Sequence, residues 1–246
     1  MLGLPKGIVA CLFDMDGVLT ETATVHAAAW KAMFDEYLRQ RSQKTGEPFV
    51  PFDPILDYDR YVDGRPRADG TRTFLTSRGI SLPEGSPSDP PTAETIEGLS
   101  NRKNAIVLEE LRSRGVTAYP GSVRYLDAVR AAGLARAVVS ASANANEVLE
   151  AAGLAQCFDL CVDGALAARE HLRGKPAPDT YLEAARELHV LPAAAAVFED
   201  ALAGVAAGRA GAFGAVIGVD RVGQADALRH FGADTVVRDL AELLEH

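Results

Sequence analysis

The sequence predicts an α/β fold, in which a parallel sheet carries helices on both faces and a helical domain is inserted after the first strand. Three observations predict this fold. Short apolar runs alternate with helix-length segments from residue 119 onward. The run at 7–13 is nearly all apolar, as expected of a strand covered on both faces. Residues 21–118 contain no long β-run, so we expect a core domain of 1–20 and 119–246 and a helical domain of 21–118.

The first strand is followed by a segment that is expected to be helical. Residues 21–41 predict one helix because apolar residues recur there at helical spacing. Pro- and Gly-rich stretches within 42–100 predict loops around a shorter helix at 68–79. A clear helix at 101–115 ends at Gly115, a residue type that favours helix ends.

After residue 119, helices and strands alternate. The expected helices are at 121–133, 144–153, 178–190, 201–212 and 240–246, and the expected strands are at 134–142, 158–164, 194–200, 213–220 and 233–239. Strands joined by helices of this length pair in parallel through right-handed crossovers. In such sheets, ligands gather at the carboxyl ends of the strands.

Composition and charge exclude several classes of protein. The formal net charge of -9 and the pI of about 5.1 argue against nucleic acid or an anionic membrane as the main partner. No apolar run approaches the ~18 residues of a membrane helix, and the N-terminal run is too short for a signal peptide. No zinc pattern surrounds the three cysteines, so we expect reduced thiols and a cytoplasmic location. The histidines expected at the surface are His171, His189, His230 and His246.

Polar side chains follow several of the predicted strands, and a lysine lies in a loop before a later helix. They are Asp14 and Asp16, then Ser140, Ser142 and Asn144, then Asp163, then Glu199 and Asp200, with Lys175 in the loop. Each piece alone has an ordinary explanation as a turn, a helix cap or a solvated charge. Because the carboxyl ends of parallel strands meet at one edge of a sheet, their order along the chain predicts a single shared site.

These residue types suit Mg²⁺-dependent phosphoryl transfer. Mg²⁺ prefers hard oxygen ligands, here the carboxylates of Asp14, Glu199 and Asp200. A carboxylate kept ionised by Lys175 and a cation can attack phosphorus, which is the role we expect for Asp14. Asp16 can move the proton of the attacking or leaving alcohol. Lys175 and Ser140 can neutralise the phosphoryl oxygens.

Other site motifs do not fit this sequence. An EF-hand loop starting at Asp14 would need Gly and Glu where Leu19 and Val25 stand. Pro176 follows Lys175, whereas a P-loop lysine is followed by Ser or Thr. No G-x-G-x-x-G fingerprint follows a predicted strand, and no G-x-S-x-G surrounds Ser140.

On these motifs the chain resembles the haloacid-dehalogenase-like (HAD) phosphotransferase superfamily. "FDMDGVLT" is similar to its first motif, Ser140 to its second, Lys175 to its third and "FEDALAG" to its fourth. The resemblance implies a Rossmann-like core with an inserted helical cap. It implies that Asp14 is the nucleophile and that Asp16 is the general acid and base, whose backbone carbonyl also binds Mg²⁺. It implies a metal site completed by Glu199 and Asp200.

Within the superfamily, the inserted segment resembles the β-phosphoglucomutase-like subgroup. "ETATVHAAAWKA", "DGRPRAD", "NRKN" and "SASAN" carry this likeness. It implies substrate contacts from Thr22, His26, Trp30, Gly64, Arg67, Lys103, Asn104, Ser142 and Asn144. It also implies a Mg²⁺-dependent, ping-pong phosphoryl exchange on a glucose phosphate through an aspartyl phosphate. We expect a monomer that acts on a small sugar phosphate.

The sequence also departs from the subgroup. Ala143 stands where the subgroup has a lysine, and Arg65 or Arg72 are the candidates to replace that cation. The inserted segment is enlarged by "QKTGEPFVPFDP" and "PEGSPSDPP", which could reshape the substrate pocket. We therefore expect a β-phosphoglucomutase, with a sugar-phosphate phosphatase as the alternative and a non-catalytic sugar-phosphate-binding module as a remote third.

Overall fold

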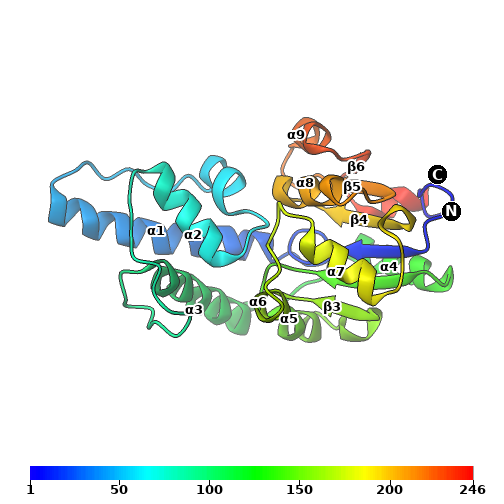
Figure 1. Cartoon of the computed structure of the whole chain (residues 1–246), viewed down its shortest axis with the longest axis horizontal. Coiled ribbons are helices and arrows are strands. Elements are labelled where there is room, and N and C mark those ends of the chain that lie inside the picture. Colours follow the sequence, from blue (N-terminus) through cyan, green and yellow to red (C-terminus); the bar gives the residue numbers. More distant parts are fainter. Residues whose placement is uncertain (246) are drawn as a thin grey trace. The chain divides into compact units, whose positions relative to one another are not determined.

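The computed structural model describes residues 1–245, so the expectations for His246 lie outside the described residues. The chain divides into two compact units (Figure 1). The core unit comprises Met1–Glu21, Gly64–Pro66 and the C-terminal part from Val116. The helical unit comprises Thr22–Asp63 and Arg67–Gly115. Gly64–Pro66 therefore belongs to the core unit although it interrupts the helical unit in the sequence.

The core unit contains one parallel sheet, which confirms the predicted α/β, Rossmann-like fold. Its strands are β1 (Ala10–Phe13), β2 (Ala135–Val139), β3 (Leu160–Val162), β4 (Ala195–Glu199), β5 (Ala215–Val219) and β6 (Thr235–Val237). Their order in the sheet is β3-β2-β1-β4-β5-β6, and every pairing is parallel. The strand order reverses at β1, which lies between β2 and β4. Parallel sheets of this kind bind ligands at the carboxyl ends of the strands beside such a reversal.

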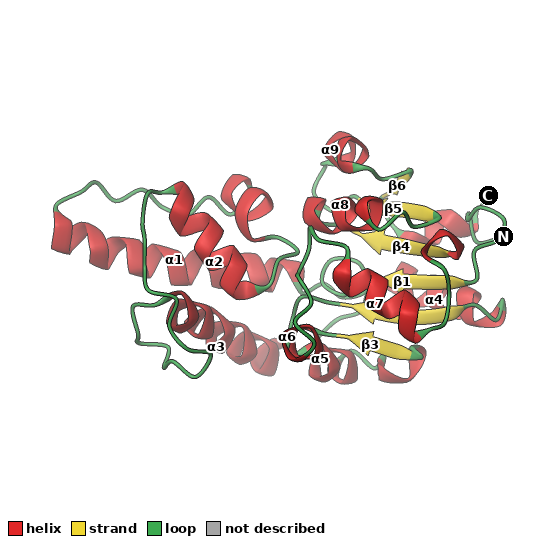
Figure 2. Cartoon of the chain, in the orientation of Figure 1, coloured by secondary structure: helices red, strands yellow, loops and turns green. Residues whose placement is uncertain are grey.

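Helices follow most of these strands (Figure 2). They are α4 (Pro120–Ala131), α5 (Ala145–Ala151), α6 (Gly164–Arg169), α7 (Asp179–Glu187), α8 (Leu202–Ala210) and α9 (Ala225–Phe231), with short 3₁₀ turns at Ala155–Cys157, Pro192–Ala194 and Leu240–Leu244. The sequence patterns did not predict α6 and α9. Both are too short for a helical repeat of apolar residues to stand out from the surrounding loops.

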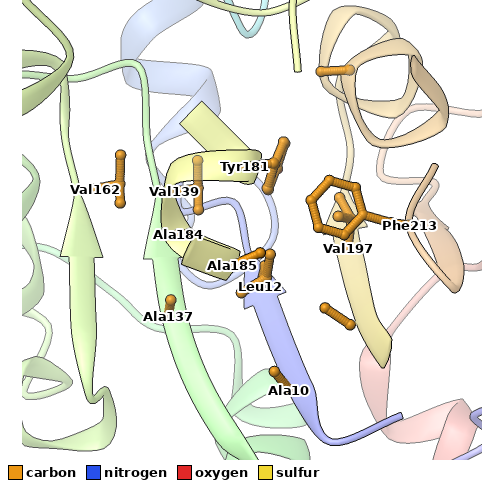
Figure 3. Close-up of a cluster of buried hydrophobic side chains, with 12 residues drawn as sticks. Ala10, Leu12, Ala137, Val139, Val162, Tyr181, Ala184, Ala185, Val197 and Phe213 are labelled. Atoms are coloured by element: carbon orange, nitrogen blue, oxygen red, sulfur yellow. The ribbon is translucent and has the colours of Figure 1, made fainter. Parts of the chain in front are cut away.

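Alternating residues of β1 explain why both faces of the sheet are covered. Leu12 packs in one apolar cluster with Tyr181 of α7 and Ala207 of α8 (Figure 3). The next residue, Phe13, points to the opposite face, where its ring meets the edge of Tyr125 of α4. Successive side chains of a strand alternate between faces, so an all-apolar strand must be buried on both.

The helical unit has its own apolar core. Its helices are α1 (Ala23–Thr45), α2 (Arg67–Ser77) and α3 (Ile96–Arg114), with a π-helical turn at Tyr58–Val62. Stacked rings of Trp30, Phe34 and Phe52 fill the space between them. The helix predicted at 101–115 begins earlier, because the Thr95 side chain accepts a hydrogen bond from Gly98 N at 2.9 Å.

The structure assigns no strand to the described residues of the helical unit, as the sequence predicted. Across residues 1–245, none of the helices combines the length and the apolar composition that crossing a bilayer requires.

Candidate active site

The predicted polar residues of the core unit meet at the carboxyl edge of the sheet. Asp14 directly follows β1, and Ser140 directly follows β2. Glu199 is the last residue of β4, and Asp200 comes next. Because β2, β1 and β4 are neighbours in the sheet, the chain brings these four residues to one place.

An acidic cluster forms the centre of this site. Asp14, Glu199 and Asp200 each offer a carboxylate oxygen, and these oxygens all lie within 4.8 Å of one another. The three residues are buried, and Glu199 has no exposed surface. Like charges at this spacing repel strongly when little water screens them, so the cluster needs positive charge close by.

Lys175 supplies part of that charge. Its Nζ donates to a carboxylate oxygen of Asp14 and to Val139 O at 3.0 Å, and it lies 2.5 Å from Glu199 Oε1. The side chain of Lys175 is almost fully buried. Burial alone would lower the pKa of Lys175, but the carboxylates of Asp14 and Glu199 outweigh it and raise that pKa above its ordinary value. Lys175 is therefore a protonated, buried cation.

Lys175 alone does not balance the site. Burial raises the pKa of Asp14 well above its ordinary range, and Lys175 opposes this shift only in part. With all three acids ionised, the cluster and Lys175 together carry two uncompensated negative charges. Oxygen ligands with this charge deficit fit a divalent cation such as Mg²⁺. The residues present therefore fit the predicted metal, with Asp14 and Asp200 as the carboxylates best placed to hold it.

Glu199 differs from the other two acids. Its Oε1 accepts a hydrogen bond from Tyr181 Oη at 2.7 Å and lies beside Lys175, and its Oε2 accepts one from Ala201 N at 3.2 Å. Gly204 on α8 leaves room for this carboxylate, since a Cβ there would lie 1.8 Å from Oε1. Protein donors thus already engage both oxygens of Glu199.

The loop after β1 is a tight turn that needs glycine. Thr20 closes it: Thr20 N and Oγ1 both donate to Met15 O, and Thr20 O accepts from Gly17 N at 2.8 Å. Gly17 has φ of 88°, and a Cβ on it would lie 1.8 Å from Asp200 Oδ2. Only glycine lets the loop that carries Asp14 and Asp16 approach the Asp200 carboxylate this closely. Asp16 itself is half-buried and close enough to influence the pKa of Asp14.

The loop after β2 is ordered by its own side chains. Ser140 Oγ accepts from Ser142 N at 3.1 Å, and Ser142 Oγ accepts from Asn144 N at 3.2 Å. Ala143 in this loop is exposed. Asp163, which the sequence grouped with the site, instead caps α6 by accepting from Leu166 N at 2.7 Å.

The predicted substrate residues of the helical unit are partly connected to one another. His26 Nδ1 and Lys103 Nζ are 2.8 Å apart, and Lys103 Nζ lies 4.9 Å from the ring of Trp30. Lys103 and Trp30 are buried. Because the ammonium of Lys103 can only donate, His26 Nδ1 accepts, and the imidazole proton is placed on Nε2.

The remaining predicted residues are divided between the two units, and Thr22 O accepts a hydrogen bond from His26 N at 3.0 Å. Thr22 is buried at the start of α1, Arg67 Nη2 donates to Asn101 at 3.4 Å, and Asn104 is half-buried on α3. Gly64 is in the core unit, where a Cβ on it would lie 2.9 Å from that of Ala201. Of the two cations considered as replacements at Ala143, Arg72 pairs with Asp69 and Glu84.

Sequence reasoning missed Tyr181, Gly204 and Gly17 as parts of the site. Tyr181 reads as an ordinary apolar position of an amphipathic helix, and Figure 3 shows it among the apolar side chains of that face. The two glycines could not be identified from the sequence, because only the fold shows that Gly17 lies against Asp200 and that Gly204 lies against Glu199.

Comparison with known proteins identifies the family of this chain. Residues 8–211 match the family model described as haloacid dehalogenase-like hydrolase. A "Beta-phosphoglucomutase" of Mycobacterium bovis is 59% identical over 99% of this chain and 94% of its own length. A "Beta-phosphoglucomutase" of Bacillus subtilis is 31% identical over 95% of this chain and 91% of its own.

A solved structure supports the same relationship. The β-phosphoglucomutase of Clostridium difficile superposes with a TM-score of 0.74 at 26% identity, covering 96% of this chain and 93% of that one. The predicted superfamily is thus confirmed by motifs, fold and overall similarity together. The chain belongs to the haloacid dehalogenase-like hydrolase family.

Proposed function

We propose that this chain is a Mg²⁺-dependent phosphotransferase that converts β-glucose 1-phosphate into glucose 6-phosphate. The observation that carries the proposal is the buried Asp14 carboxyl, held by Lys175 beside Asp200 at the carboxyl edge of the sheet. Similarity to proteins named β-phosphoglucomutase over nearly the whole chain supports the choice of substrate. We assign Asp14 as the nucleophile because Lys175 holds its carboxylate, whereas protein donors already engage both oxygens of Glu199.

The reaction we propose consists of two phosphoryl transfers. The 6-hydroxyl oxygen of the sugar attacks the phosphorus of phosphorylated Asp14, the bond between that phosphorus and the Asp14 oxygen breaks, and Asp16 takes the hydroxyl proton. The sugar bisphosphate then presents its 1-phosphate. Asp14 attacks this phosphorus, and the sugar O1 leaves with the proton that Asp16 returns. Asp14 ends phosphorylated again, so the cycle is balanced.

The neighbours of Asp14 would stabilise the charge that moves in these steps. Lys175 and Ser140 would contact the phosphoryl oxygens. We place Mg²⁺ on Asp14, on Asp200 and on the backbone carbonyl of Asp16, where it would neutralise charge on the transferring group. We assign Glu199 to holding Lys175 in place, because protein donors already engage both of its oxygens.

The helical unit is proposed to act as a cap. Its role would be to bind the sugar and to exclude water, which would otherwise hydrolyse the aspartyl phosphate. The residues we propose for sugar-phosphate binding are Thr22, His26, Trp30, Arg67, Lys103 and Asn104, with Gly64, Ser142 and Asn144 from the core unit. The His26–Lys103 pair, in which Lys103 is buried and His26 is half-buried, is a preformed polar group of the kind that fixes ligand orientation.

A sugar-phosphate phosphatase is the second candidate. Its first step would be the same, with water in place of the 6-hydroxyl as the final acceptor. The description of the matching family as hydrolases favours it. The core residues alone do not distinguish the two acceptors, because Asp14 and Asp16 would have the same roles in both reactions.

A coupled assay separates the two candidates. Purified protein with Mg²⁺ and a trace of glucose 1,6-bisphosphate, which phosphorylates Asp14, is given β-glucose 1-phosphate. Glucose 6-phosphate and free phosphate are measured in the same reaction. We expect glucose 6-phosphate to form much faster than phosphate is released. Rapid phosphate release without the isomer would make the protein a phosphatase.

Matched variants test the nucleophile. Asp14→Asn should abolish both activities, and Asp16→Asn should slow both by about 10²–10⁴-fold, the usual contribution of a general acid or base. Asp127→Asn is the control, because Asp127 is exposed and forms an ion pair with Arg130 on the surface of the same helix, α4. Turnover by a folded Asp14→Asn protein would mean that another residue carries the phosphoryl group.

A further inference from the structure

The loop between β5 and α9 contacts both loops that carry the acidic cluster, and neither motifs nor family resemblance assigned it a role. Asp220 holds the turn of this loop, since its Oδ1 accepts from Gly223 N at 2.6 Å and from Gln224 N at 2.8 Å. Two side chains extend from it toward the site edge. They are Arg221 and Gln224, and each donates to the backbone of a different acidic loop.

Arg221 holds the loop after β1. Its Nε donates to Gly17 O at 2.8 Å, and its Nη2 lies 3.4 Å from Val18 O. Its Nη1 donates to Arg238 O at 2.8 Å and to Asp239 Oδ2 at 3.3 Å. Only 16% of the side chain is exposed. All three nitrogens of the guanidinium are therefore engaged, and two of them hold the turn that carries Asp14 and Asp16.

Gln224 holds the other acidic loop. Its Nε2 donates to Asp200 O at 3.0 Å. Gly17 and the Asp200 carboxylate are themselves in close contact, because no Cβ fits between them. The loop after β5 thus fixes both partners of this contact from one side.

Arg221 also contacts Tyr119, close to where the chain returns to the core unit. Its guanidinium carbon lies 3.6 Å from the ring centroid of Tyr119, a stacking contact. Tyr119 N donates to Leu19 O at 2.9 Å, and Glu21 N donates to Thr117 O at 2.9 Å, so the outgoing and returning linkers pair with each other. The same arginine therefore touches both the loop after β1 and Tyr119 of the returning segment.

We propose that Arg221, assisted by Gln224, is a positioning residue that sets the spacing of the carboxylates of Asp14 and Asp200 for the divalent cation. It acts through backbone carbonyls and touches neither substrate nor the reacting atoms. This inference rests on the proposed function for its link to catalysis. Its effect on cation binding can be measured without turnover.

Cation binding gives the direct test. Mg²⁺ affinity is measured by calorimetry on the intact wild-type chain and on Arg221→Gln, together with the thermal midpoint of each protein. We expect Mg²⁺ affinity to fall by about 10–100-fold, the usual cost of removing a group that orients metal ligands. At saturating Mg²⁺, kcat should fall while the KM for the sugar phosphate stays within about twofold, because Arg221 does not contact the sugar.

Two variants serve as comparisons. Arg221→Lys keeps one donor for Gly17 O but loses the other guanidinium donors and the stacking on Tyr119. Its Mg²⁺ affinity should therefore lie between those of Arg221→Gln and the wild type. Arg229→Gln should bind Mg²⁺ like the wild type, since Arg229 is exposed and pairs with Asp226 on the surface of α9. A folded Arg221→Gln protein with Mg²⁺ affinity within twofold of wild type would overturn the proposal.

Remaining outcomes are also decisive. If Arg221→Gln does not fold, Gln224→Ala replaces it: affinity about 3–10-fold weaker supports the proposal, and unchanged affinity overturns it. If the wild type fails to isomerise β-glucose 1-phosphate while Arg221→Gln still binds Mg²⁺ more weakly, the proposed function is wrong and the positioning role stands.

Discussion

Replacing Tyr181 with phenylalanine removes one buried hydroxyl and leaves the surrounding packing in place. Tyr181 Oη donates to Glu199 Oε1 at 2.7 Å, and neither residue has exposed surface. Burial and the nearby Glu199 carboxylate raise the pKa of Tyr181 well above its ordinary value, so the hydroxyl stays protonated and donates. The phenylalanine ring keeps the edge contact with Phe213.

The expected cost follows from the charge of the acceptor. A buried hydrogen bond to a charged group contributes about 1.5–3 kcal/mol to the free energy of unfolding. For a chain of this size, each kcal/mol shifts the thermal midpoint by about 2–4 °C, so Tyr181→Phe should lower it by about 3–12 °C. Scanning calorimetry without added metal measures this shift.

Tyr125 provides a matched control. Its ring is equally buried, but its hydroxyl donates to a neutral acceptor, Leu2 O, at 2.8 Å. Tyr125→Phe should therefore cost about 0.5–1.5 kcal/mol. If Tyr181→Phe destabilises the protein no more than Tyr125→Phe does, the Tyr181 hydroxyl is not donating to an ionised Glu199, and our account of how Lys175 is held is wrong.

Three further predictions test other parts of the structure. Mg²⁺ at about 100 times its Kd should stabilise the wild type by about 2.7 kcal/mol, which raises the thermal midpoint by about 5–11 °C. Asp200→Asn should lose most of this shift. Equal shifts in the two proteins would mean that the cation binds elsewhere. Burial raises the pKa of Cys11 and of Cys161 to about 12, so iodoacetamide at pH 8 should modify the half-buried Cys157 first. Peptide mass spectrometry measures the order of labelling. Faster labelling of Cys11 than of Cys157 would contradict the burial of Cys11. Arg65→Gln should raise the KM for the sugar phosphate by about tenfold. Arg72→Gln should leave that KM unchanged, because Arg72 already pairs with Asp69 and Glu84. Equal effects of the two variants on KM would contradict a special role of Arg65.

The edge of the sheet could be predicted from the sequence because it depends on local patterns. Apolar runs followed by acids place Asp14 and Asp200 after strands, and parallel pairing brings those strand ends together. For Asp163 the same pattern left two roles open, because an acid after a strand can also cap the next helix, as Asp163 does for α6.

The supports of the site could not be predicted in this way. From the sequence, an arginine in a loop is expected to be a solvated charge. Only the fold shows that Arg221 donates to the carbonyl of Gly17, which is far away in the sequence. Tyr181 reads as a core residue because helical periodicity does not show which apolar position also donates to a buried carboxylate. Such contacts depend on tertiary distances, which periodicity and composition do not encode.

The charge balance of the site explains why a cation beyond Lys175 matters for a sugar phosphate. A divalent cation would neutralise the two negative charges that Lys175 leaves on the acidic cluster, but the non-reacting phosphate of the substrate would bring more negative charge. Ala143 offers that phosphate no cation. Both sequence neighbours of Arg65 pack on the core unit. Gly64 packs on Ala201, and Pro66 packs on Gly174, the residue before Lys175. Within residues 1–245 Arg65 has no ion pair of its own, so its charge is available for an anion at the edge of the core unit.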